Sequence, residues 1–434
     1  MTNYARLLRT WQRLRTFQYR DLEYIKASQL ARFKKLLRHA YEKIPMYREF
    51  YDSQGITPSQ VRYFEEIEEV PVITKDIIRS FPIRKRVAPG IPEKLVYKVR
   101  TSGSTGEPLE IWNNRTESLI QTLKGIRFLR EWGYSPLDNT IRLWGGDSET
   151  KKSVVQKYGL FKRKDVAILD QPDVAINEIS QSGCDVLMGV RSSLEALADA
   201  LEIRNVQIKP HICVSMGEMV MEEHRKRFEK LFGCKTLSIY GCEEIGNIAW
   251  ECPVSERNLH VDMETVLLNL EENNSPDEER LRSVIATNLE SFTMPFIRYK
   301  LGDYVLSPEE KVCKCGRTLP LLGEVRGRHD DILEHHGRKY YWNFFYNQLV
   351  DKQYIKKYKI IQTIKGSIEF RILLSENNED TRSICISDLS AAFKDHFSPL
   401  SIRFVDDFEL PPNRKFKVLE KESATGDYSL ARDG

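Results

Sequence analysis

A loop rich in glycine and hydroxyl side chains, Thr101–Pro108, has the sequence TSGSTGEP. Its glycines let the backbone turn sharply and approach a ligand closely. Backbone N–H groups and hydroxyls that face the same space suit phosphate oxygens. The loop lacks the lysine of the common P-loop pattern, GxxxxGK followed by Ser or Thr. Taken alone, it is consistent with either a flexible turn or a phosphate-binding loop.

Three later segments place a carboxylate or an arginine beside a glycine at a predicted strand end. They are Tyr240–Gly246 (YGCEEIG), Met294–Asp303 (MPFIRYKLGD) and Gly327–Asp331 (GRHDD). A carboxylate there can hold Mg²⁺ or the diol of a ribose, and an arginine can bind phosphate. Each segment alone is also explained by turn glycines and salt bridges, so only their combination is informative.

Two pairs of cysteine and histidine residues have the chemistry of a zinc site. Cys252 and His260 lie in ECPVSERNLH, and Cys313 and Cys315 lie in CKCGR. Four such ligands satisfy tetrahedral Zn²⁺, and a site filled by four protein ligands is structural. The alternative is a set of buried free thiols. We interpret the remaining cysteines as packing residues: Cys184, Cys213, Cys234, Cys242 and Cys385.

The middle of the chain alternates short apolar runs with helical patterns. Apolar runs at 185–190, 212–217 and 236–241 predict buried strands. Helices are predicted from Ser192, as its cap, to Leu201 and from Glu222 to Phe232. This alternation favours an α/β sheet that binds ligands at the carboxyl ends of its strands.

Two further regions follow the α/β part. Residues 282–288 and 295–305 are predicted strands of a more β-rich region. After Gly327 and Arg328 the pattern changes to a helix near 342–350 and strands near 357–363 and 367–375. A chain of 434 residues exceeds one hydrophobic core. We therefore expect a second, smaller α+β domain from about residue 330 to 434.

The first 50 residues form a basic segment that is expected to be helical. Residues 5–38 contain ten Lys or Arg and two acidic residues. Apolar positions from Leu30 onward fit helical spacing up to Pro45. The basic face is either a solvated surface of a packed helix or a weak contact with an anionic membrane surface.

Composition excludes several classes of protein. A net charge of +3 does not suggest nucleic-acid binding. The chain has no apolar run long enough for a transmembrane helix, and its N-terminus has no secretory signal. Eight cysteines are too sparse for a disulfide scaffold, which favours a reducing cytoplasm.

The order of the motifs carries a family resemblance. In the order of five motifs and a late lysine, the chain resembles the adenylate-forming superfamily of acyl- and aryl-CoA ligases. The motifs are TSGSTGEP, SMGE, YGCEE, IRYKLGD and GRHDD. The most similar branch is the phenylacetate–CoA ligase and CapK-like family, from about His39 to the C-terminus. The resemblance implies an α/β fold, with an adenylation domain over 1–329 and a small mobile domain over 330–434. The small domain is expected to rotate between half-reactions.

The resemblance also implies a two-step reaction. A small-molecule carboxylate attacks the α-phosphate of ATP, and the acyl-adenylate then loses AMP to a thiol such as CoA. Both reactants are anionic, so Mg²⁺ and fixed donors must offset their repulsion. Some relatives act in polysaccharide or natural-product pathways and transfer the acyl group to an amine. A degenerate, non-catalytic binding or scaffold protein is a further alternative. Whether the protein is a monomer or a homodimer stays open.

Residue roles are carried over from the matching motifs. Glu244 is expected to coordinate Mg²⁺, Asp303 to bind the ribose hydroxyls and Arg328 to lie near ribose and phosphate, with Asp330 as the hinge. Several members of this branch carry a structural zinc at positions matching the four ligands above. The residues expected to wrap the β- and γ-phosphates are Ser102, Gly103, Ser104, Thr105 and Gly106. The residues expected to line the adenine pocket are Gly217, Glu218, Met219, Tyr240 and Gly241.

The sequence departs from the family pattern at two functional positions. Lys415 is the expected catalytic cation, but Arg414 stands where the family has glycine, so Lys417 or Arg414 are alternatives. Glu243 stands where threonine is usual in YGxTE, which would weaken ATP affinity or alter the substrate. Candidates for the acid pocket are Trp144, Gly145 and Gly146, and Trp144 fits a core role equally well.

Overall fold

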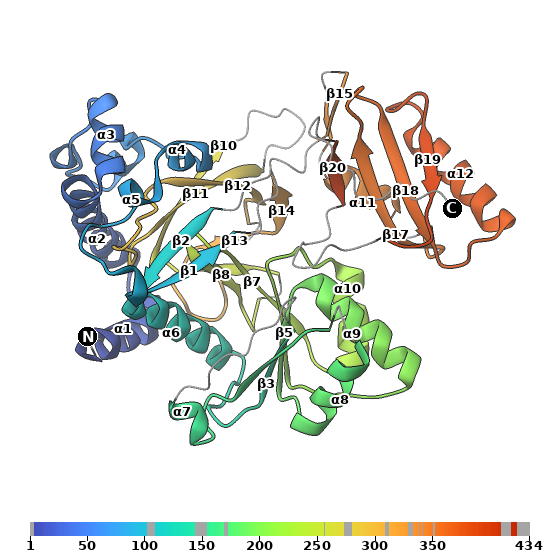
Figure 1. Ribbon diagram of the computed structural model, residues 1–434, viewed down its shortest axis with the longest axis horizontal. Coiled ribbons are helices and arrows are strands. Elements are labelled where there is room, and N and C mark those ends of the chain that lie inside the picture. Colours follow the sequence, from blue (N-terminus) through green and yellow to red (C-terminus); the bar gives the residue numbers. More distant parts are fainter. Residues whose placement is uncertain are drawn as a thin grey trace. The chain divides into compact units, whose positions relative to one another are not determined.

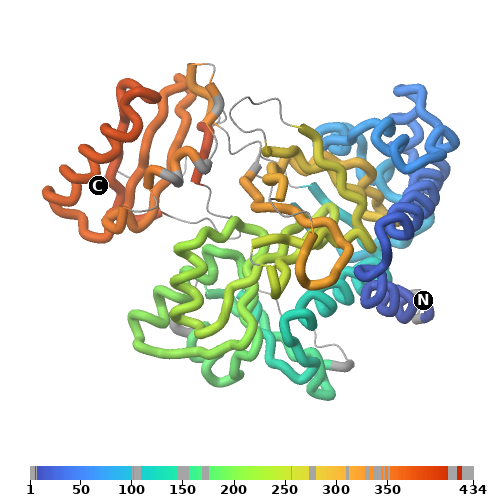
Figure 2. The backbone as a smooth tube through the Cα atoms, turned by 180° about the vertical axis from the view of Figure 1, so that it is seen from behind, coloured from blue at the N-terminus to red at the C-terminus, as the bar shows by residue number. Residues whose placement is uncertain are grey.

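The computed structural model of the chain divides into two compact units, Met1–Val325 and Arg326–Gly434 (Figures 1 and 2). The residues that the structure describes are 4–101, 109–143, 154–168, 172–255, 257–272, 280–308, 312–328, 333–336, 338–340, 342–349, 352–408 and 418–422. Among these residues, no helix combines the length and the apolar character needed to cross a membrane.

The first unit begins with helices α1 (Tyr4–Thr16), α2 (Leu22–Lys43) and α3 (Pro45–Ser53). Asp21 caps α2 by accepting a hydrogen bond from the backbone N–H of Tyr24. The predicted end of this helix before Pro45 is confirmed, because α2 stops at Lys43 and the proline starts α3. Short helical segments follow: 3-10 turns at Pro58–Gln60, Glu65–Glu69 and Glu93–Leu95, and helices α4 (Lys75–Ser80) and α5 (Ile83–Arg86).

An eight-stranded sheet forms the centre of the first unit, in the order β13-β9-β8-β7-β6-β5-β3-β4. Strands β3 to β7 pair in parallel, and β8, β9 and β13 pair antiparallel. The alternation of strands and helices predicted from the sequence is thus confirmed. The strands are β3 (Thr140–Leu143), β4 (Arg163–Val166), β5 (Val186–Gly189), β6 (Ile212–Met216), β7 (Thr236–Cys242), β8 (Gly246–Glu251), β9 (Leu259–Val261) and β13 (Leu321–Leu322). Helix α6 (Arg115–Glu131) precedes β3, and the helices between the strands are α7 (Val154–Lys157), α8 (Pro172–Ser182), α9 (Arg191–Arg204) and α10 (Glu222–Phe232).

The prediction that Ser192 caps its helix is wrong. Helix α9 begins one residue earlier, at Arg191, and its cap residue is Val190, which has no side-chain acceptor. Ser192 lies inside the first turn, where its backbone N–H and its hydroxyl both donate to the carboxylate of Glu218. The first N–H groups of a helix have no partner within the helix. In α9 one of them finds its acceptor in Glu218, which is distant in the sequence, rather than in a local cap.

Antiparallel strands form the β-rich part of the first unit. Strand β1 (Val96–Arg100) pairs with β2 (Glu110–Asn114), and β11 (Leu281–Asn288) lies between β10 (Val266–Glu272) and β12 (Tyr299–Leu306). The strand predicted over 295–305 begins only at Tyr299. Arg298 has a left-handed backbone, with φ of +46°, which interrupts an extended chain. Strand β14 (Val325–Arg328) spans the junction of the two units.

The second unit is an α+β structure with an aromatic core. Strands β17 (Ile355–Gln362) and β18 (Ile368–Leu374) pair antiparallel, and β19 (Ser401–Phe404) and β20 (Leu419–Lys421) extend the sheet in parallel at either edge. A hairpin of β15 (Leu333–His335) and β16 (Arg338–Tyr340) precedes helix α11 (Trp342–Leu349), and α12 (Glu379–Phe393) follows β18. The fully buried core rings are Phe345, Phe370, Phe393 and Phe397.

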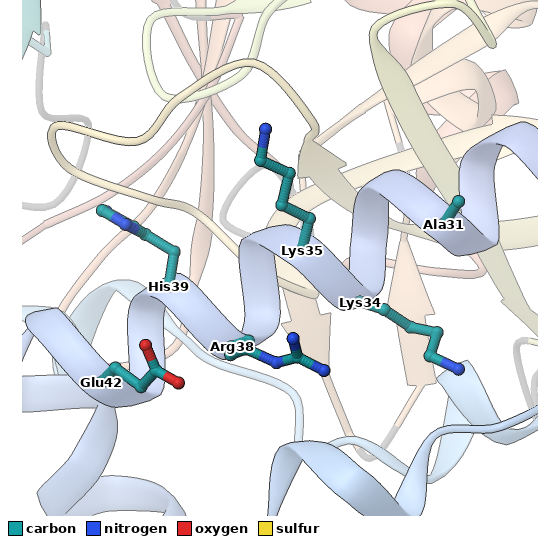
Figure 3. A pocket seen from close by; sticks show the side chains of 6 residues that line it. All are labelled: Ala31, Lys34, Lys35, Arg38, His39 and Glu42. Carbon is teal, nitrogen blue, oxygen red and sulfur yellow. The ribbon is translucent and has the colours of Figure 1, made fainter.

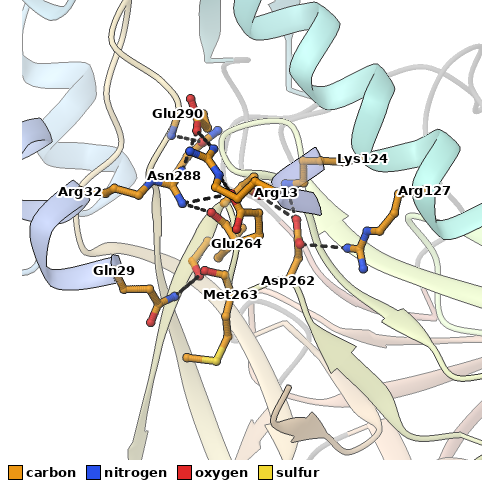
Figure 4. Close-up of polar contacts among 12 residues, drawn as sticks. Arg13, Gln29, Arg32, Lys124, Arg127, Asp262, Met263, Glu264, Asn288 and Glu290 are labelled. Atoms are coloured by element: carbon orange, nitrogen blue, oxygen red, sulfur yellow. Dashed lines mark hydrogen bonds and ion pairs between the residues drawn. The ribbon is translucent and has the colours of Figure 1, made fainter. Parts of the chain in front are cut away.

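A buried network of charges joins helices α1, α2 and α6 to the segments that follow β9 and β11 (Figure 4). The Asp262 carboxylate contacts the Nζ of Lys124 at 3.3 Å and the Nη2 of Arg127 at 2.9 Å, and all three side chains are almost fully buried. Glu264 and Glu290 pair with Arg13 and Arg32. Two arginines of the basic N-terminal segment are therefore paired with buried carboxylates.

Candidate functional site

The predicted phosphate loop connects β1 to β2. Its residues 102–108, with Ser102, Gly103, Ser104, Thr105 and Gly106, lie outside the described part of the chain. The two flanking residues are described and paired. The N–H of Thr101 donates to the carbonyl of Leu109 at 3.0 Å, and the N–H of Leu109 donates to Oγ1 of Thr101 at 2.9 Å. A short antiparallel hairpin therefore fixes both ends of the loop.

The turn between β7 and β8 contains the YGCEEIG motif and needs glycine at two positions. A Cβ on Gly241 would lie 2.4 Å from the carbonyl oxygen of Gly246. Gly246 has a φ of +81°, and a Cβ there would lie 2.3 Å from the side chain of Gln121 on α6. The tight turn places the carboxylate of Glu244 in a position that is only 9% exposed.

Two tyrosines connect this turn to strand β12. The hydroxyl of Tyr240 donates to Oδ2 of Asp303 at 2.8 Å, and the hydroxyl of Tyr299 donates to Oε1 of Glu244 at 3.0 Å. Tyr299 and Asp303 lie on the same strand, on either side of an irregularity at which the pairing of β11 with β12 shifts register. The structure thus brings together three residues predicted for nucleotide and Mg²⁺ binding: Tyr240, Glu244 and Asp303.

Cys242 lies between these carboxylates. Burial raises the pKa of its thiol well above the usual value, and the negative charges of Glu244 and Asp303 add to the effect. A protonated thiol is a poor nucleophile. This agrees with the interpretation of Cys242 as a packing residue.

The segment after β6 carries Gly217, Glu218 and Met219. Gly217 has a φ of +74°, which lets the chain turn sharply at the carboxyl end of the strand. The Glu218 carboxylate accepts hydrogen bonds from the N–H of Ser192 at 2.8 Å and its hydroxyl at 3.0 Å. Its side chain is therefore directed to the start of α9, and the Gly217 turn is held between two strand–helix units.

Several predicted site residues lie outside the described part of the chain. These are Lys415 and its alternatives Arg414 and Lys417, the hinge residue Asp330, and the acid-pocket candidates Trp144, Gly145 and Gly146. Arg328 ends strand β14, and its side chain is not described.

The four predicted zinc ligands form one cluster. Their ligand atoms all lie within 4.8 Å of one another. The Sγ atoms of Cys252 and Cys313 are 3.5 Å apart, and the Sγ of Cys315 is 3.2 Å from Nε2 of His260. Ligands on a tetrahedron with metal distances of about 2.0–2.3 Å are separated by about 3.5 Å, so the donor set fits Zn²⁺.

Burial affects the ligands of the cluster in opposite ways. It lowers the pKa of His260 to about 4, which keeps the imidazole neutral at pH 7 and able to bind a metal. It raises the pKa of Cys313 to about 12, so this thiol would lose its proton only on binding a metal. Burial also raises the pKa of Cys315, but hydrogen bonds from the backbone and side chain of Arg317 outweigh it, so that pKa lies below its usual value. The Arg317 guanidinium would offset the excess negative charge of three thiolates around one Zn²⁺.

A shallow hollow lies along the outer face of α2 (Figure 3). Lys35 and His39 extend to one side of the helix, whereas Lys34 and Arg38 extend to the other. Because these groups diverge, they do not form a site for one small anion. The residues lining the hollow are Ala31, Lys34, Lys35, Arg38, His39 and Glu42.

Sequence reasoning predicted no role in the site for Tyr299 or Ser192, although both contact predicted site residues. The signal for Tyr299 was present, because Tyr299 and Asp303 share a face of the predicted strand. No local pattern indicates that Ser192 pairs with Glu218, which lies 26 residues away.

Comparison with known proteins agrees with this fold. The chain is 25% identical over 333 residues to phenylacetate–coenzyme A ligase of Thermus thermophilus, covering 72% of each chain. It is 23% identical over 410 residues to the enzyme of that name from Pseudomonas putida, covering 86% of this chain and 88% of the relative. No family model matches the chain.

Among solved structures, 2-hydroxyisobutyryl-CoA ligase in complex with an acyl-AMP superposes with a TM-score of 0.77 at 16% identity. The match covers 95% of this chain and 92% of that structure, which shows a shared fold. The chain thus shares the fold of an adenylate-forming CoA ligase. Its sequence is similar to those of the phenylacetate–coenzyme A ligases.

Proposed function

We propose that this protein is an adenylate-forming ligase, which activates an aryl or acyl carboxylic acid with ATP and transfers it to CoA. The observation that carries the proposal is the pairing of Tyr240 with Asp303 and of Tyr299 with Glu244 across one site. Homology to phenylacetate–coenzyme A ligases over most of the chain supports the same reaction.

The residues of the site have separate roles in this reaction. The Asp303 carboxylate accepts hydrogen bonds from the ribose hydroxyls, and Tyr240 holds that carboxylate in place. Tyr299 orients Glu244, whose carboxylate is the donor type that Mg²⁺ prefers. A bound Mg²⁺ supplies positive charge that offsets the repulsion between the acid and the triphosphate. The protein does little of the covalent chemistry in this reaction, so these residues contribute mainly by positioning the reactants.

A screen for pyrophosphate release tests the proposed function. Aryl, fatty and amino acids are supplied with ATP and Mg²⁺, with and without CoA. Release that depends on an acid supports adenylation, and the mass of the product then identifies the acceptor as CoA or an amine. No release with any acid, together with no ATP binding by calorimetry, would contradict the proposal and favour a non-catalytic scaffold. The exposed Glu243 in the YGxTE position is the feature that motivates this second reading.

The finer assignments rest on the resemblance described above. A CapK-like role in surface-polysaccharide or natural-product synthesis, with an amine as acceptor, follows if the screen yields amides rather than thioesters. A cytoplasmic location and the choice between monomer and homodimer remain predictions.

We propose a structural zinc ion in the cluster of Cys252, His260, Cys313 and Cys315. Purified protein is expected to contain about one zinc per chain, because structural zinc sites contribute roughly 10–16 kcal/mol of binding free energy. Replacing Cys313 with serine is expected to release the metal and lower the melting temperature. Metal analysis and thermal melting check this. The matched control is Cys184→Ser, which alters a half-buried thiol outside the cluster. Absence of zinc and unchanged melting of Cys313→Ser would contradict the site.

We propose Lys415 as the cation that stabilises the adenylation step. Replacing it with alanine is expected to slow acid-dependent pyrophosphate exchange while leaving thioester formation from a supplied acyl-adenylate intact. The loss of a charge-assisted contact predicts a decrease of about 10- to 100-fold in exchange. Arg414→Ala and Lys417→Ala are the matched variants, since either residue is an alternative for the role. Equal losses in both half-reactions would argue against the assignment of Lys415.

A further inference from the structure

We propose that Lys75 supplies the positive charge that the TSGSTGEP loop lacks, by binding the β- and γ-phosphates of ATP. This inference rests on the proposed function. The Nζ of Lys75 donates to Oγ1 of Thr101 at 3.3 Å. Thr101 is the residue that precedes the loop and is 7% exposed. The lysine, 26 positions earlier in the chain, therefore lies at the base of the loop.

The backbone around Lys75 is fastened to the strand that carries the ribose-binding carboxylate. Lys75 is the first residue of α4, and Thr74 caps that helix through the N–H of Ile77. The N–H of Ile73 donates to the carbonyl of Arg298, and the N–H of Lys300 donates to the carbonyl of Ile73, each at 3.0 Å. These bonds flank Tyr299 at the start of β12. The position of the Lys75 backbone is thus fixed relative to the strand that carries Tyr299 and Asp303.

The chemistry of the loop leaves a role for such a cation. Glycine N–H groups and hydroxyls are neutral donors, whereas a triphosphate carries several negative charges. Lysine provides a compact charge on a flexible stem, which suits phosphate binding. A rotation of the side chain would move Nζ from Thr101 to a phosphate oxygen. Oγ1 of Thr101 would keep its hydrogen bond from the N–H of Leu109, so this acceptor would not lose all of its partners.

A purely structural role for Lys75 makes a different prediction. If the lysine only fastened the base of the loop, its loss would weaken every ligand of the site and lower stability. If it binds the β- and γ-phosphates, its loss weakens ATP and pyrophosphate but spares AMP and the acyl-adenylate, which lack these groups. The distinguishing measurement is therefore the ratio of ATP to AMP affinity.

The experiment compares Lys75→Ala, Lys75→Arg and the control Lys85→Ala, each made in the full chain. Lys85 lies on the neighbouring helix α5 and pairs with Glu49 at the surface. Calorimetry with Mg²⁺ measures the affinities for ATP, pyrophosphate and AMP, and thioester formation from a supplied acyl-adenylate is followed separately. For Lys75→Ala we expect ATP and pyrophosphate to bind about 10- to 100-fold more weakly, with AMP and thioester formation unchanged. Lys75→Arg is expected to recover most of the ATP affinity, and Lys85→Ala to match the wild type.

The remaining outcomes either overturn the inference or test it separately from the proposed function. Equal weakening of ATP and AMP in Lys75→Ala, or ATP affinity equal to that of the wild type, would overturn it. A wild-type protein that binds ATP but activates no acid would contradict the proposed reaction, while the ATP-to-AMP ratio would still decide the role of Lys75. A wild-type protein that does not bind ATP would overturn both.

Discussion

Replacing Asp303 with alanine is expected to abolish both half-reactions of the proposed enzyme. Ribose anchoring serves adenylation and transfer alike, and the change removes an acceptor for two ribose hydroxyls. Two charge-assisted hydrogen bonds are worth about 3–6 kcal/mol together, which corresponds to a loss of about 10²- to 10⁴-fold. The measurements are acid-dependent pyrophosphate exchange and thioester formation from a supplied acyl-adenylate.

A companion variant separates the role of the Asp303 carboxylate from that of the tyrosine that holds it. Tyr240→Phe keeps Asp303 but removes the donor at 2.8 Å, so a smaller loss of about 10-fold is expected in both steps. Thermal melting of each variant shows whether the fold is intact. If Asp303→Ala lost only thioester formation and retained exchange, ribose binding by Asp303 would be wrong.

Replacing Asp262 with alanine is expected to produce a large loss of stability. The change leaves Lys124 and Arg127 buried without their shared carboxylate. Breaking a buried ion pair by removing one partner costs roughly 3–5 kcal/mol. Urea denaturation of the variant, followed by fluorescence and circular dichroism, measures the change.

The matched control for Asp262→Ala is an exposed ion pair in the same unit. Lys85 and Glu49 are each close to half exposed, and such pairs contribute about 0–1 kcal/mol. Glu49→Ala is therefore expected to leave the denaturation midpoint nearly unchanged. A comparable shift in both variants would mean that the buried Asp262 network contributes no more to stability than the exposed ion pair. Replacing Lys124 by methionine together with Asp262 by leucine is expected to recover part of the loss, because an apolar pair removes buried charges.

The central sheet was predictable from sequence because its signals are local. Parallel strands buried on both faces read as apolar runs, as at 185–190 and 212–217, and charged helices such as Glu222–Phe232 separate them. The hairpin of β15 and β16 was not predicted. Its sequence, LEHHGRKY, is mostly polar, so no alternation of apolar residues marks it as strand.

The contacts that organise the site were harder to predict because they join distant parts of the chain. Arg13 and Arg32 belong to a basic segment, but their acceptors Glu264 and Glu290 lie more than 230 positions away. A single sequence gives no indication of such pairs. By contrast, Tyr240, Glu244 and Asp303 each lie in a recognisable motif that contains glycine. Motif chemistry therefore indicated the residues, and only the three-dimensional structure gave their partners.

The bond between Glu218 and Ser192 has a consequence for ligand selectivity. The amino end of a long helix carries partial positive charge and free N–H groups, so it attracts phosphate wherever it is open. The carboxylate of Glu218 occupies that end of α9, next to the Gly217 turn where the family resemblance leads us to expect adenine. Glu218 thereby blocks a second anion-binding site beside the expected position of the adenine. A nucleotide entering in reverse would meet a carboxylate where its phosphates need a donor, which favours a single orientation of ATP.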